Sequence, residues 1–179
     1  MTLILGGARS GKSRYAQSLW GNSGRVVYIA TARADEVARD HEMRERVARH
    51  RADRPANWTT VEEPLDLPRA VREAPAEAIL LIDCVTLWVS NLMWEYRGQT
   101  TAAQERLILA QVHDLILASR RSECAGEIII VSNEVGGGLA PESPVGRAFR
   151  DLQGFANQHL ARAADKVVFI VAGLPLPLK

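Results

Sequence analysis

The sequence predicts an α/β fold with three layers, in which helices flank a mostly parallel central sheet. Short runs rich in Ile, Val and Leu recur along the chain without polar alternation, and longer helical segments separate them. Unalternated apolar runs are typical of strands covered on both faces. Alternation of strand with helix indicates right-handed crossover units. With 179 residues, the chain is expected to form a single domain, residues 1–179.

The expected elements follow one another in strict alternation. The apolar runs predict strands at Thr2–Leu5, Val26–Ile29, Ile79–Ile82, Ile128–Val131 and Val167–Val171. The segments between them predict helices at Lys12–Trp20, Asp35–Arg51, Thr101–Arg121 and Val145–Ala164. Clusters of Gly, Pro and polar residues predict loops at Asn22–Arg25, Pro64–Pro68, Arg97–Thr100 and Glu134–Pro144.

Two segments carry further expectations. Within Thr101–Arg121 the apolar face is expected to hold Ala103, Leu107, Ala110 and Leu117. The run TLWVSNLMW, Thr86–Trp94, is apolar nearly all the way round a helix. A helix of this kind is either deeply buried or covered by another subunit, and the sequence favours neither alternative.

Charge and composition argue against several classes of partner. The formal net charge is +1, so neither nucleic acid nor a membrane surface is an expected partner. No run approaches the ~20 apolar residues of a membrane span. The first residues, MTLILGGARSGK, lack the basic and long apolar regions of a signal peptide. Cys84 and Cys124 have no metal-binding spacing and are expected to be reduced thiols in a cytoplasmic protein.

A phosphate-binding loop follows the first predicted strand. The stretch GGARSGKS matches the pattern G-x-x-x-x-G-K-[ST] and lies between an apolar strand and a helix, which is the context that the motif requires. Glycines allow close backbone approach, and the loop N–H groups with the helix dipole can then hold an anionic phosphate. Lys12 is expected to reach the β and γ phosphates. The predicted nucleotide-binding residues of the loop are Gly6, Gly7, Ala8, Arg9, Ser10, Gly11, Lys12 and Ser13.

A second acidic support for Mg²⁺ is expected at a strand end. The run ILLID places Asp83 directly after four apolar residues, at the carboxyl edge of the predicted sheet. Ser13 and Asp83 are therefore the predicted metal ligands and Mg²⁺ the predicted cofactor. Together these features predict binding of a nucleoside triphosphate, but a phosphate loop alone serves kinases, motors and switches alike.

Further segments carry a family resemblance over nearly the whole chain. They are GGARSGKSRYA, VVYIATA at Val26–Ala32, DHEMRERVARHRADRPANWTTVEEP at Asp40–Pro64, LLIDCVTLWVSNLM at Leu80–Met93, and the stretch Val131–Leu176 with its N-E-V-G motif. In this order they closely resemble the bifunctional adenosylcobinamide kinase / adenosylcobinamide-phosphate guanylyltransferases of cobalamin biosynthesis. The segments H-x-x-x-R-P-x-x-W and N-E-V-G are more particular to that family than the phosphate loop is.

The resemblance implies a fold, two reactions and an assembly. The fold would be a RecA-like P-loop NTPase. ATP or GTP would phosphorylate adenosylcobinamide. GMP would then pass from GTP to adenosylcobinamide phosphate through a covalent GMP on a histidine, giving adenosylcobinamide-GDP and pyrophosphate. The family assembles as trimers, so a homotrimer is expected.

One of the four histidines matches the guanylylated position of the family. By the resemblance it is His50, in RHRADRPANW. Because Pro55 disfavours helical geometry at Arg54, the helix should end there and His50 should lie near its last turn. His41 is nine residues earlier, which is half a turn out of register on a helix. A neutral imidazole can attack the α-phosphorus, since its free pKa lies near ~6.5. Without the resemblance, a histidine in so charged a helix is more often a solvated surface group.

The remaining site residues also come from the resemblance. Arg51 and Arg54 are expected to contact phosphates, because guanidinium groups clamp phosphate oxygens. Glu62 matches a guanine-nucleotide contact, and its carboxylate suits the guanine N–H donors. Thr31, Ala32 and Arg33 match another nucleotide-contacting stretch. The arginines before His50 are interpreted as surface residues. Asn133 and Glu134 begin a glycine-rich loop on the expected substrate side and are its expected direct participants, without an assigned chemical role.

Two other functions remain open at this point. The chain could be a P-loop kinase of another small alcohol in which His50 is structural, or a nucleotide-binding regulatory protein without chemistry of its own. The kinase alternative predicts γ-phosphate transfer without covalent GMP, and the regulatory alternative predicts binding without turnover. The preferred kinase donor and the corrinoid-binding residues leave no legible motif.

Overall fold

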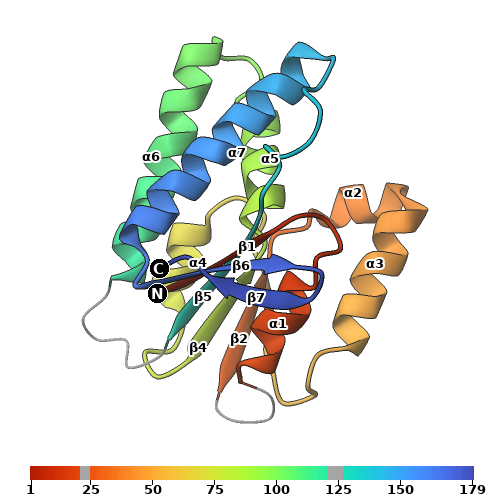
Figure 1. Cartoon of the computed structure of the whole chain (residues 1–179), viewed down its shortest axis with the longest axis vertical. Helices are drawn as coiled ribbons and strands as arrows, with labels where there is room; N and C mark the ends of the chain where they lie inside the picture. Colours follow the sequence, from red (N-terminus) through yellow and green to blue (C-terminus); the bar gives the residue numbers. More distant parts are fainter. Residues whose placement is uncertain (21–24, 121–126) are drawn as a thin grey trace.

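A computed structural model of the chain describes residues 1–20, 25–120 and 127–179. Its centre is a seven-stranded sheet with the order β3-β2-β4-β5-β1-β6-β7 (Figure 1). Every neighbouring pair is parallel except β6 and β7, which are antiparallel. The strands are β1 (Thr2–Gly6), β2 (Val26–Ala30), β3 (Thr59–Glu62), β4 (Ile79–Asp83), β5 (Ile128–Asn133), β6 (Lys166–Val171) and β7 (Leu174–Pro177). The predicted α/β fold is confirmed.

The two strands that the sequence did not predict are the edge strands. All four residues of β3 are exposed, and so are those of β7. β3 is mostly polar, and β7 contains Pro175 and Pro177, which edge strands tolerate because one side of the ladder needs no N–H donor. Pairing with β2 and β6 therefore defines these strands, rather than a local pattern.

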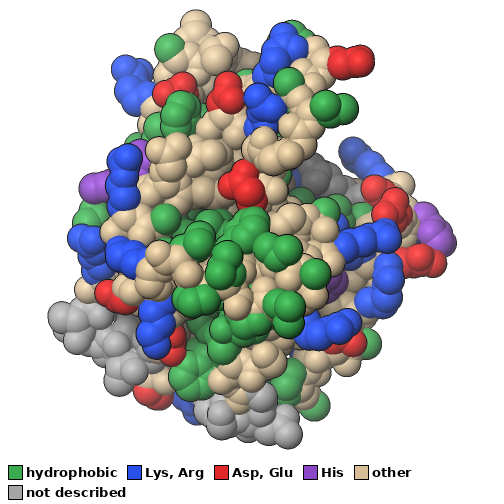
Figure 2. Space-filling model, viewed as in Figure 1, with side chains coloured by type: hydrophobic (Ala, Val, Ile, Leu, Met, Phe, Trp, Pro, Cys, Tyr) green, Lys and Arg blue, Asp and Glu red, His purple; other side chains and the backbone are tan. Residues whose placement is uncertain are grey.

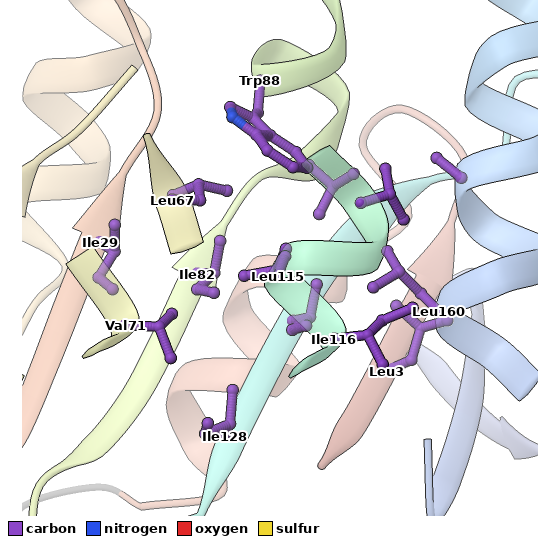
Figure 3. Close-up of a cluster of buried hydrophobic side chains, with 14 of the residues drawn as sticks. Leu3, Ile29, Leu67, Val71, Ile82, Trp88, Leu115, Ile116, Ile128 and Leu160 are labelled. Carbon is purple, nitrogen blue, oxygen red and sulfur yellow. The ribbon is translucent and has the colours of Figure 1, made fainter. Parts of the chain in front are cut away.

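One face of the sheet is covered by four helices. They are α4 (Leu67–Glu73), α5 (Val85–Glu95), α6 (Thr101–Ser119) and α7 (Pro144–Ala163). Alternate strand residues such as Leu3, Ile29 and Ile82 point into this layer and pack with Trp88 of α5 and Leu115 of α6 (Figure 3). This is the larger of the two cores, and it holds the carboxyl ends of β1, β4 and β5 rigidly in place.

The opposite face has a thinner cover. The intervening strand residues, among them Ile4, Tyr28 and Val131, pack there with Ala16 of α1 (Lys12–Ser18) and with Trp58. Beyond α1 stand α2 (Ala34–Arg39) and α3 (His41–Ala52), at the side of the molecule (Figure 1). The three layers are thus unequal: a thick helical layer, the sheet, and a sparse layer that leaves room beside the phosphate-loop region.

Two predictions of element boundaries were wrong. The helix expected at Asp35–Arg51 is two helices, because Asp40 has extended backbone geometry and caps α3: its carboxylate accepts from the N–H groups of Glu42 and Met43 at 2.9 and 3.2 Å. The loop expected at Pro64–Pro68 ends where α4 begins at Leu67, with Asp66 as its cap. A capping carboxylate overrides the continuity of a charged run.

The expected apolar face of α6 was also wrong. The buried residues of α6 are Ile108, Val112, Leu115, Ile116 and Ala118, whereas Leu117 is 53% exposed and Ala110 is exposed. Two helical stripes compete in this sequence, and the one with larger side chains buries more apolar area. In α5, by contrast, Trp88, Val89 and Leu92 are buried within the chain itself, while Trp94 near its end is 57% exposed. Deep burial therefore accounts for most of the apolar run.

The remaining predicted elements are confirmed within a residue or two at their ends. The expected loop at Asn22–Arg25, the end of the helix expected at Arg121, and Cys124 lie wholly or partly outside the described residues. The free thiol that the structure does describe is Cys84. No helix within residues 1–20, 25–120 and 127–179 is long and apolar enough to cross a membrane.

Candidate active site

The loop after β1 has the backbone geometry that a phosphate cradle needs. Arg9 and Gly11 have positive φ angles of 58° and 97°. A Cβ on Gly6 would lie 2.7 Å from the carbonyl oxygen of Ile170, and one on Gly11 would lie 3.3 Å from Gly173 Cα. Both glycines are therefore required sterically, by close approach to β6 and to the turn after it. The helix α1 starts directly afterwards at Lys12.

Lys12 lies over this loop and is only 5% exposed. Its ammonium donates to the carbonyl oxygen of Gly7 at 3.1 Å. Burial lowers the pKa of Lys12 below its ordinary value, and the nearby Cys84 and Asp83 act against that shift. A buried cation beside the phosphate loop gains most from an anionic ligand, because little water screens the interaction.

Asp83 stands at the end of β4, and a tyrosine orients it. The hydroxyl of Tyr28 on β2 donates to Asp83 Oδ2 at 2.8 Å. Burial, then the neighbouring carboxylate of Asp83, raises the pKa of Tyr28, so this phenol remains a donor. Next to Asp83, the carbonyl oxygen of Cys84 accepts from the hydroxyl of Thr31 at 2.8 Å, and the N–H of Cys84 donates to that hydroxyl at 3.0 Å. Burial raises the pKa of the Cys84 thiol to about 11.

A cavity of about 300 Å³ connects these groups with the helix α3. On the sheet side it is lined by Lys12, Ser13, Tyr28, Asp83 and Asn133. On the helix side it is lined by Met43, Arg46, Val47 and His50, which share one helical face at spacings of three and four residues. The parallel sheet makes this meeting possible, because β1, β2, β4 and β5 all end at the same edge.

The two histidines of α3 are separated as the helical register predicts. His50 lies in the last turn and lines the cavity. His41 is the first residue of the helix; its side chain is 76% exposed, with Nδ1 3.9 Å from the carboxylate of Glu45. His41 is therefore outside the site.

The two arginines that were predicted to contact phosphates, Arg51 and Arg54, contact protein groups in this structure. Arg51 forms an ion pair with Glu62. The guanidinium of Arg54 stacks on the ring of Tyr28, 3.4 Å from its centroid, and donates to Thr60 Oγ1 at 3.1 Å. Arg51, Arg54 and Glu62 also line a second hollow of about 360 Å³ with Pro55, Ala56, Trp58 and Thr60, so they form the wall between two open spaces.

Comparison with known proteins identifies the family. The family described as cobinamide kinase / cobinamide phosphate guanyltransferase matches residues 2–178. Among curated proteins, the bifunctional adenosylcobalamin biosynthesis protein CobP of Pseudomonas aeruginosa is 46% identical over 179 residues, covering 99% of this chain and 96% of its own. The CobU protein of Escherichia coli K12 is 40% identical over 186 residues, covering 100% and 99%. The chain belongs to this family.

Solved structures of low sequence identity share the fold. A protein from Pyrococcus horikoshii OT3 superposes with a TM-score of 0.58 at 10% identity, covering 100% of this chain and 85% of its own. An ATPase from the type III secretion system of pathogenic bacteria superposes with a TM-score of 0.57 at 11% identity, covering 98% and 56%. These likenesses confirm the RecA-like α/β fold of the family member described here.

Eight of the sixteen residues that the sequence predicted for the site meet in the cavity. Lys12, Ser13, Ala32, His50, Arg51, Arg54, Glu62 and Asp83 line it. Thr31 is fully buried behind the cavity wall, where its hydroxyl donates to the carbonyl oxygen of Cys84. Arg33 forms an ion pair with Asp35 at 3.1 Å. Neither side chain lines the cavity. Residues Gly6–Gly11 form the loop in front of Lys12, and the exposed side chain of Arg9 lies 3.9 Å from Glu42.

Two residues of the site were not found from the sequence, and a third was named without a role. Arg46 was interpreted as surface, yet it lines the cavity one turn before His50. Spacing of four residues on one helix could have identified it. Tyr28 gave no sequence signal, since it lies inside an apolar strand. Asn133 was named without a role, and the structure places it in the cavity wall.

Proposed function

We propose that this chain phosphorylates adenosylcobinamide with ATP or GTP and then transfers GMP from GTP to the new phosphate through a covalent GMP on His50. Family membership supports both reactions. The observation that carries the proposal is that one cavity brings His50 opposite Lys12, Ser13 and Asp83. A phosphate cradle and a nucleophilic imidazole that share one cavity can serve two different phosphorus atoms of a triphosphate.

In the first reaction, the chain binds and orients the triphosphate. The loop N–H groups and Lys12 hold its β and γ phosphates. The hydroxyl oxygen of adenosylcobinamide attacks the γ-phosphorus, and the bond to the β–γ bridging oxygen breaks. The nucleoside diphosphate leaves with that electron pair. Lys12 offsets the charge that grows on the phosphate oxygens in a site with little screening water.

The donor set fits Mg²⁺, which would bind through Ser13 and Asp83. A hydroxyl and a carboxylate are the hard oxygen ligands that Mg²⁺ prefers, and it characteristically takes its other ligands from phosphates and water. Groups of three or more His, Cys, Asp or Glu side chains that could hold a metal by themselves are absent from the described residues. When bound, Mg²⁺ would neutralise phosphate charge. The hydrogen bond from Tyr28 keeps the Asp83 carboxylate oriented for it.

In the second reaction, His50 is the nucleophile. A ring nitrogen attacks the α-phosphorus of GTP, a P–N bond forms, and the P–O bond to pyrophosphate breaks. Arg46, Arg51 and Arg54 line the same cavity and can offset the charge on the departing pyrophosphate. A phosphate oxygen of adenosylcobinamide phosphate then attacks the α-phosphorus. The P–N bond breaks, and His50 regains its neutral ring.

Covalent labelling tests the proposal. The protein is incubated with GTP carrying ³²P at the α position and with Mg²⁺, denatured, and examined for label that acid removes and base does not. We expect such label on the wild type and none on His50→Ala, because the attacking nitrogen is gone. Turnover of adenosylcobinamide with ATP is measured on the same preparations.

The matched control is His41→Ala, which removes a histidine of the same helix outside the cavity. It should label like the wild type. An unlabelled wild type that still phosphorylates adenosylcobinamide would favour the kinase without guanylyl transfer. Nucleotide binding without either reaction would favour a regulatory protein.

We also propose that the chain assembles as a homotrimer in the cytoplasm, as the family resemblance implies. Hydrophobic side chains gather on the face of the molecule where β6 and β7 lie (Figure 2). Val171, Leu174, Leu176 and Leu178 are each more than half exposed, which is typical of a surface that another subunit covers. Light scattering after size-exclusion chromatography measures the assembly; a monomeric mass would contradict the trimer.

A further inference from the structure

Thr31 follows β2 directly and lies where the pairing of β2 with β4 stops. The last residues in register on these strands are Ala30 and Asp83. Thr31 and Cys84 come next, and here a side chain continues the pairing. The hydroxyl of Thr31 donates to the carbonyl oxygen of Cys84 at 2.8 Å and accepts from the N–H of Cys84 at 3.0 Å. One hydroxyl therefore bonds both backbone polar groups of the residue after Asp83.

Thr31 itself is held in place from the side of α5. Its exposed fraction is 0%, and its side chain does not line the cavity. Its carbonyl oxygen accepts from Asn91 Nδ2 at 2.8 Å in a buried hydrogen bond. The side chain thus has no surface with which to touch a nucleotide. Any effect of Thr31 on the site has to pass through the residues that it bonds.

Asn91 is a buried amide in the apolar run of α5. It is 2% exposed and lies between the buried residues Trp88 and Leu92 in the chain. Its Nδ2 also donates to the carbonyl oxygen of Pro64 at 3.0 Å, so both N–H donors have an acceptor. Burying an amide is costly unless it is hydrogen-bonded. The bonds of Asn91 hold the segments that follow β2 and β3.

Asp83 is consequently held at two places by residues of one strand and its continuation. The hydroxyl of Tyr28 on β2 donates to Asp83 Oδ2 at 2.8 Å, which orients the carboxylate. Thr31 holds the backbone on the carboxyl side of Asp83, which sets the position of that carboxylate. Hydrogen bonds between buried groups fix such positions more firmly than solvent-exposed ones.

We propose that Thr31 is a positioning residue for Asp83 as a ligand of Mg²⁺, and that it acts without touching the nucleotide. This inference rests on the proposed function, in which Ser13 and Asp83 bind Mg²⁺. The ion demands near-ideal octahedral geometry, with ligand oxygens at about 2.0–2.1 Å. A carboxylate whose backbone shifts meets that demand less well. Residues that support a metal ligand in this way typically change metal affinity by about 10–100-fold.

The first test uses the protein without metal or nucleotide. Thr31→Val keeps the shape of the side chain and removes the hydroxyl, whereas Thr31→Ser keeps the hydroxyl. Because the N–H of Cys84 loses its acceptor in Thr31→Val, its hydrogen exchange should be roughly 10-fold faster than in the wild type. In Thr31→Ser it should stay within about twofold. NMR measures the exchange, and equal rates in all three proteins would overturn the proposal.

The second test separates the metal from the nucleotide. Equilibrium binding of a fluorescent methylanthraniloyl GTP is measured across a Mg²⁺ titration and again in EDTA. For Thr31→Val we expect the Mg²⁺ concentration that gives the half-maximal effect to rise roughly 10-fold. Affinity in EDTA should stay within about twofold, because no nucleotide contact is lost. Thr31→Ser should restore the wild-type Mg²⁺ requirement.

The matched control is Thr2→Val, at the amino end of β1 and thus at the opposite edge of the sheet. Thr2 is also buried, at 5% exposed, and its hydroxyl donates to Glu127 Oε1 at 2.9 Å. Thr2 does not line the cavity. This variant loses a buried threonine hydrogen bond, so it should lower the free energy of unfolding as Thr31→Val does. It should leave the Mg²⁺ requirement unchanged.

Two binding results would overturn the role of Thr31. One is an equal loss of nucleotide affinity with and without Mg²⁺, which would assign Thr31 to the nucleotide contact itself. The other is an equal rise of the Mg²⁺ requirement in Thr31→Val and Thr2→Val, which would trace it to lost stability. Thr31→Ala also lacks the hydroxyl and replaces Thr31→Val if that variant does not fold. These measurements need no adenosylcobinamide, so a wild type that binds nucleotide with Mg²⁺ but does not phosphorylate adenosylcobinamide would contradict the proposed function alone.

Discussion

The two walls of the cavity are built in opposite ways. On the sheet wall, Lys12 is buried, Asp83 accepts from Tyr28, and Asn133 is held by buried polar side chains. On the other wall, α3 has no buried residue at all. Lys12 and Asp83, the groups proposed for γ-phosphate transfer, thus belong to the core of the molecule, whereas the proposed nucleophile His50 stands on a helix that the core does not hold.

Two helices that line the cavity make the same contrast. In α5, Trp88 is fully buried and its indole N–H donates to the carbonyl oxygen of Leu65 at 2.7 Å. In α3, the Asp40 cap and the ion pair between Arg51 and Glu62 are surface interactions. Surface interactions of this kind are individually weak. The difference predicts that local opening costs less free energy in α3 than in α5.

The largest expected effect is on the free energy of unfolding, which should depend more on α5 than on α3. Trp88→Ala should lower the free energy of unfolding by about 3–5 kcal/mol, because it leaves a cavity in the main core. Val47→Ala on α3 should lower it by less than about 1 kcal/mol, since that side chain is not buried. Urea denaturation measures both. Hydrogen exchange should be faster in α3 than in α5; equal protection would remove the contrast.

The next effect is on the two reaction rates, which should depend on different walls of the cavity. Lys12→Ala should reduce phosphorylation of adenosylcobinamide by roughly 10²–10³-fold, because it removes the buried cation at the phosphates. Arg46→Ala, on the opposite wall, should slow covalent GMP formation and leave phosphorylation much less affected. Initial rates of both reactions measure the two variants. Retained phosphorylation in Lys12→Ala would refute the role given to Lys12.

A smaller effect concerns the residue that touches both walls. Tyr28→Phe removes the hydroxyl that orients Asp83 but keeps the ring under Arg54. A hydrogen bond of this kind contributes roughly 0.5–1.5 kcal/mol. We expect the Mg²⁺ concentration for half-maximal phosphorylation to rise several-fold, while His50 labelling at saturating Mg²⁺ is unchanged. An unchanged Mg²⁺ requirement would show that Asp83 needs no such support.

The smallest effect lies away from both walls and sets the baseline. Burial alone raises the pKa of Glu63, but the N–H groups of Asp66 and Leu65 and the guanidinium of Arg69 hold it below its ordinary value overall. Because the folded pKa is lower, the stabilisation is present above the unfolded value near ~4.3 and is lost as the pH falls through the folded value.

Glu63→Gln should therefore reduce the free energy of unfolding at neutral pH by under about 1 kcal/mol, as expected for a partly screened charge. The difference from the wild type should shrink as the pH falls below the unfolded pKa of Glu63. Urea denaturation at several pH values measures it; a difference that grows in acid would contradict the assignment.

The sequence by itself determined the parts of this protein that depend on neighbouring residues. The phosphate loop is a local motif, and five central strands are continuous apolar runs, so both could be predicted. The family resemblance pointed to His50, and helical register separated it from His41. The edge strands β3 and β7 escaped prediction because pairing with another strand, rather than a local pattern, stabilises them.

The sequence predicted that Asp83 lies beside the phosphate loop, but the tertiary structure decided which other residues meet there. Lys12, Tyr28, Asp83 and Asn133 are far apart in the chain, and they converge because parallel strands end at a common edge. No local pattern announces that Tyr28 bonds Asp83, that Arg46 lines the cavity with His50, or that buried polar groups hold Asn133. The physical reason is that such contacts depend on strand order and register, which long-range packing sets.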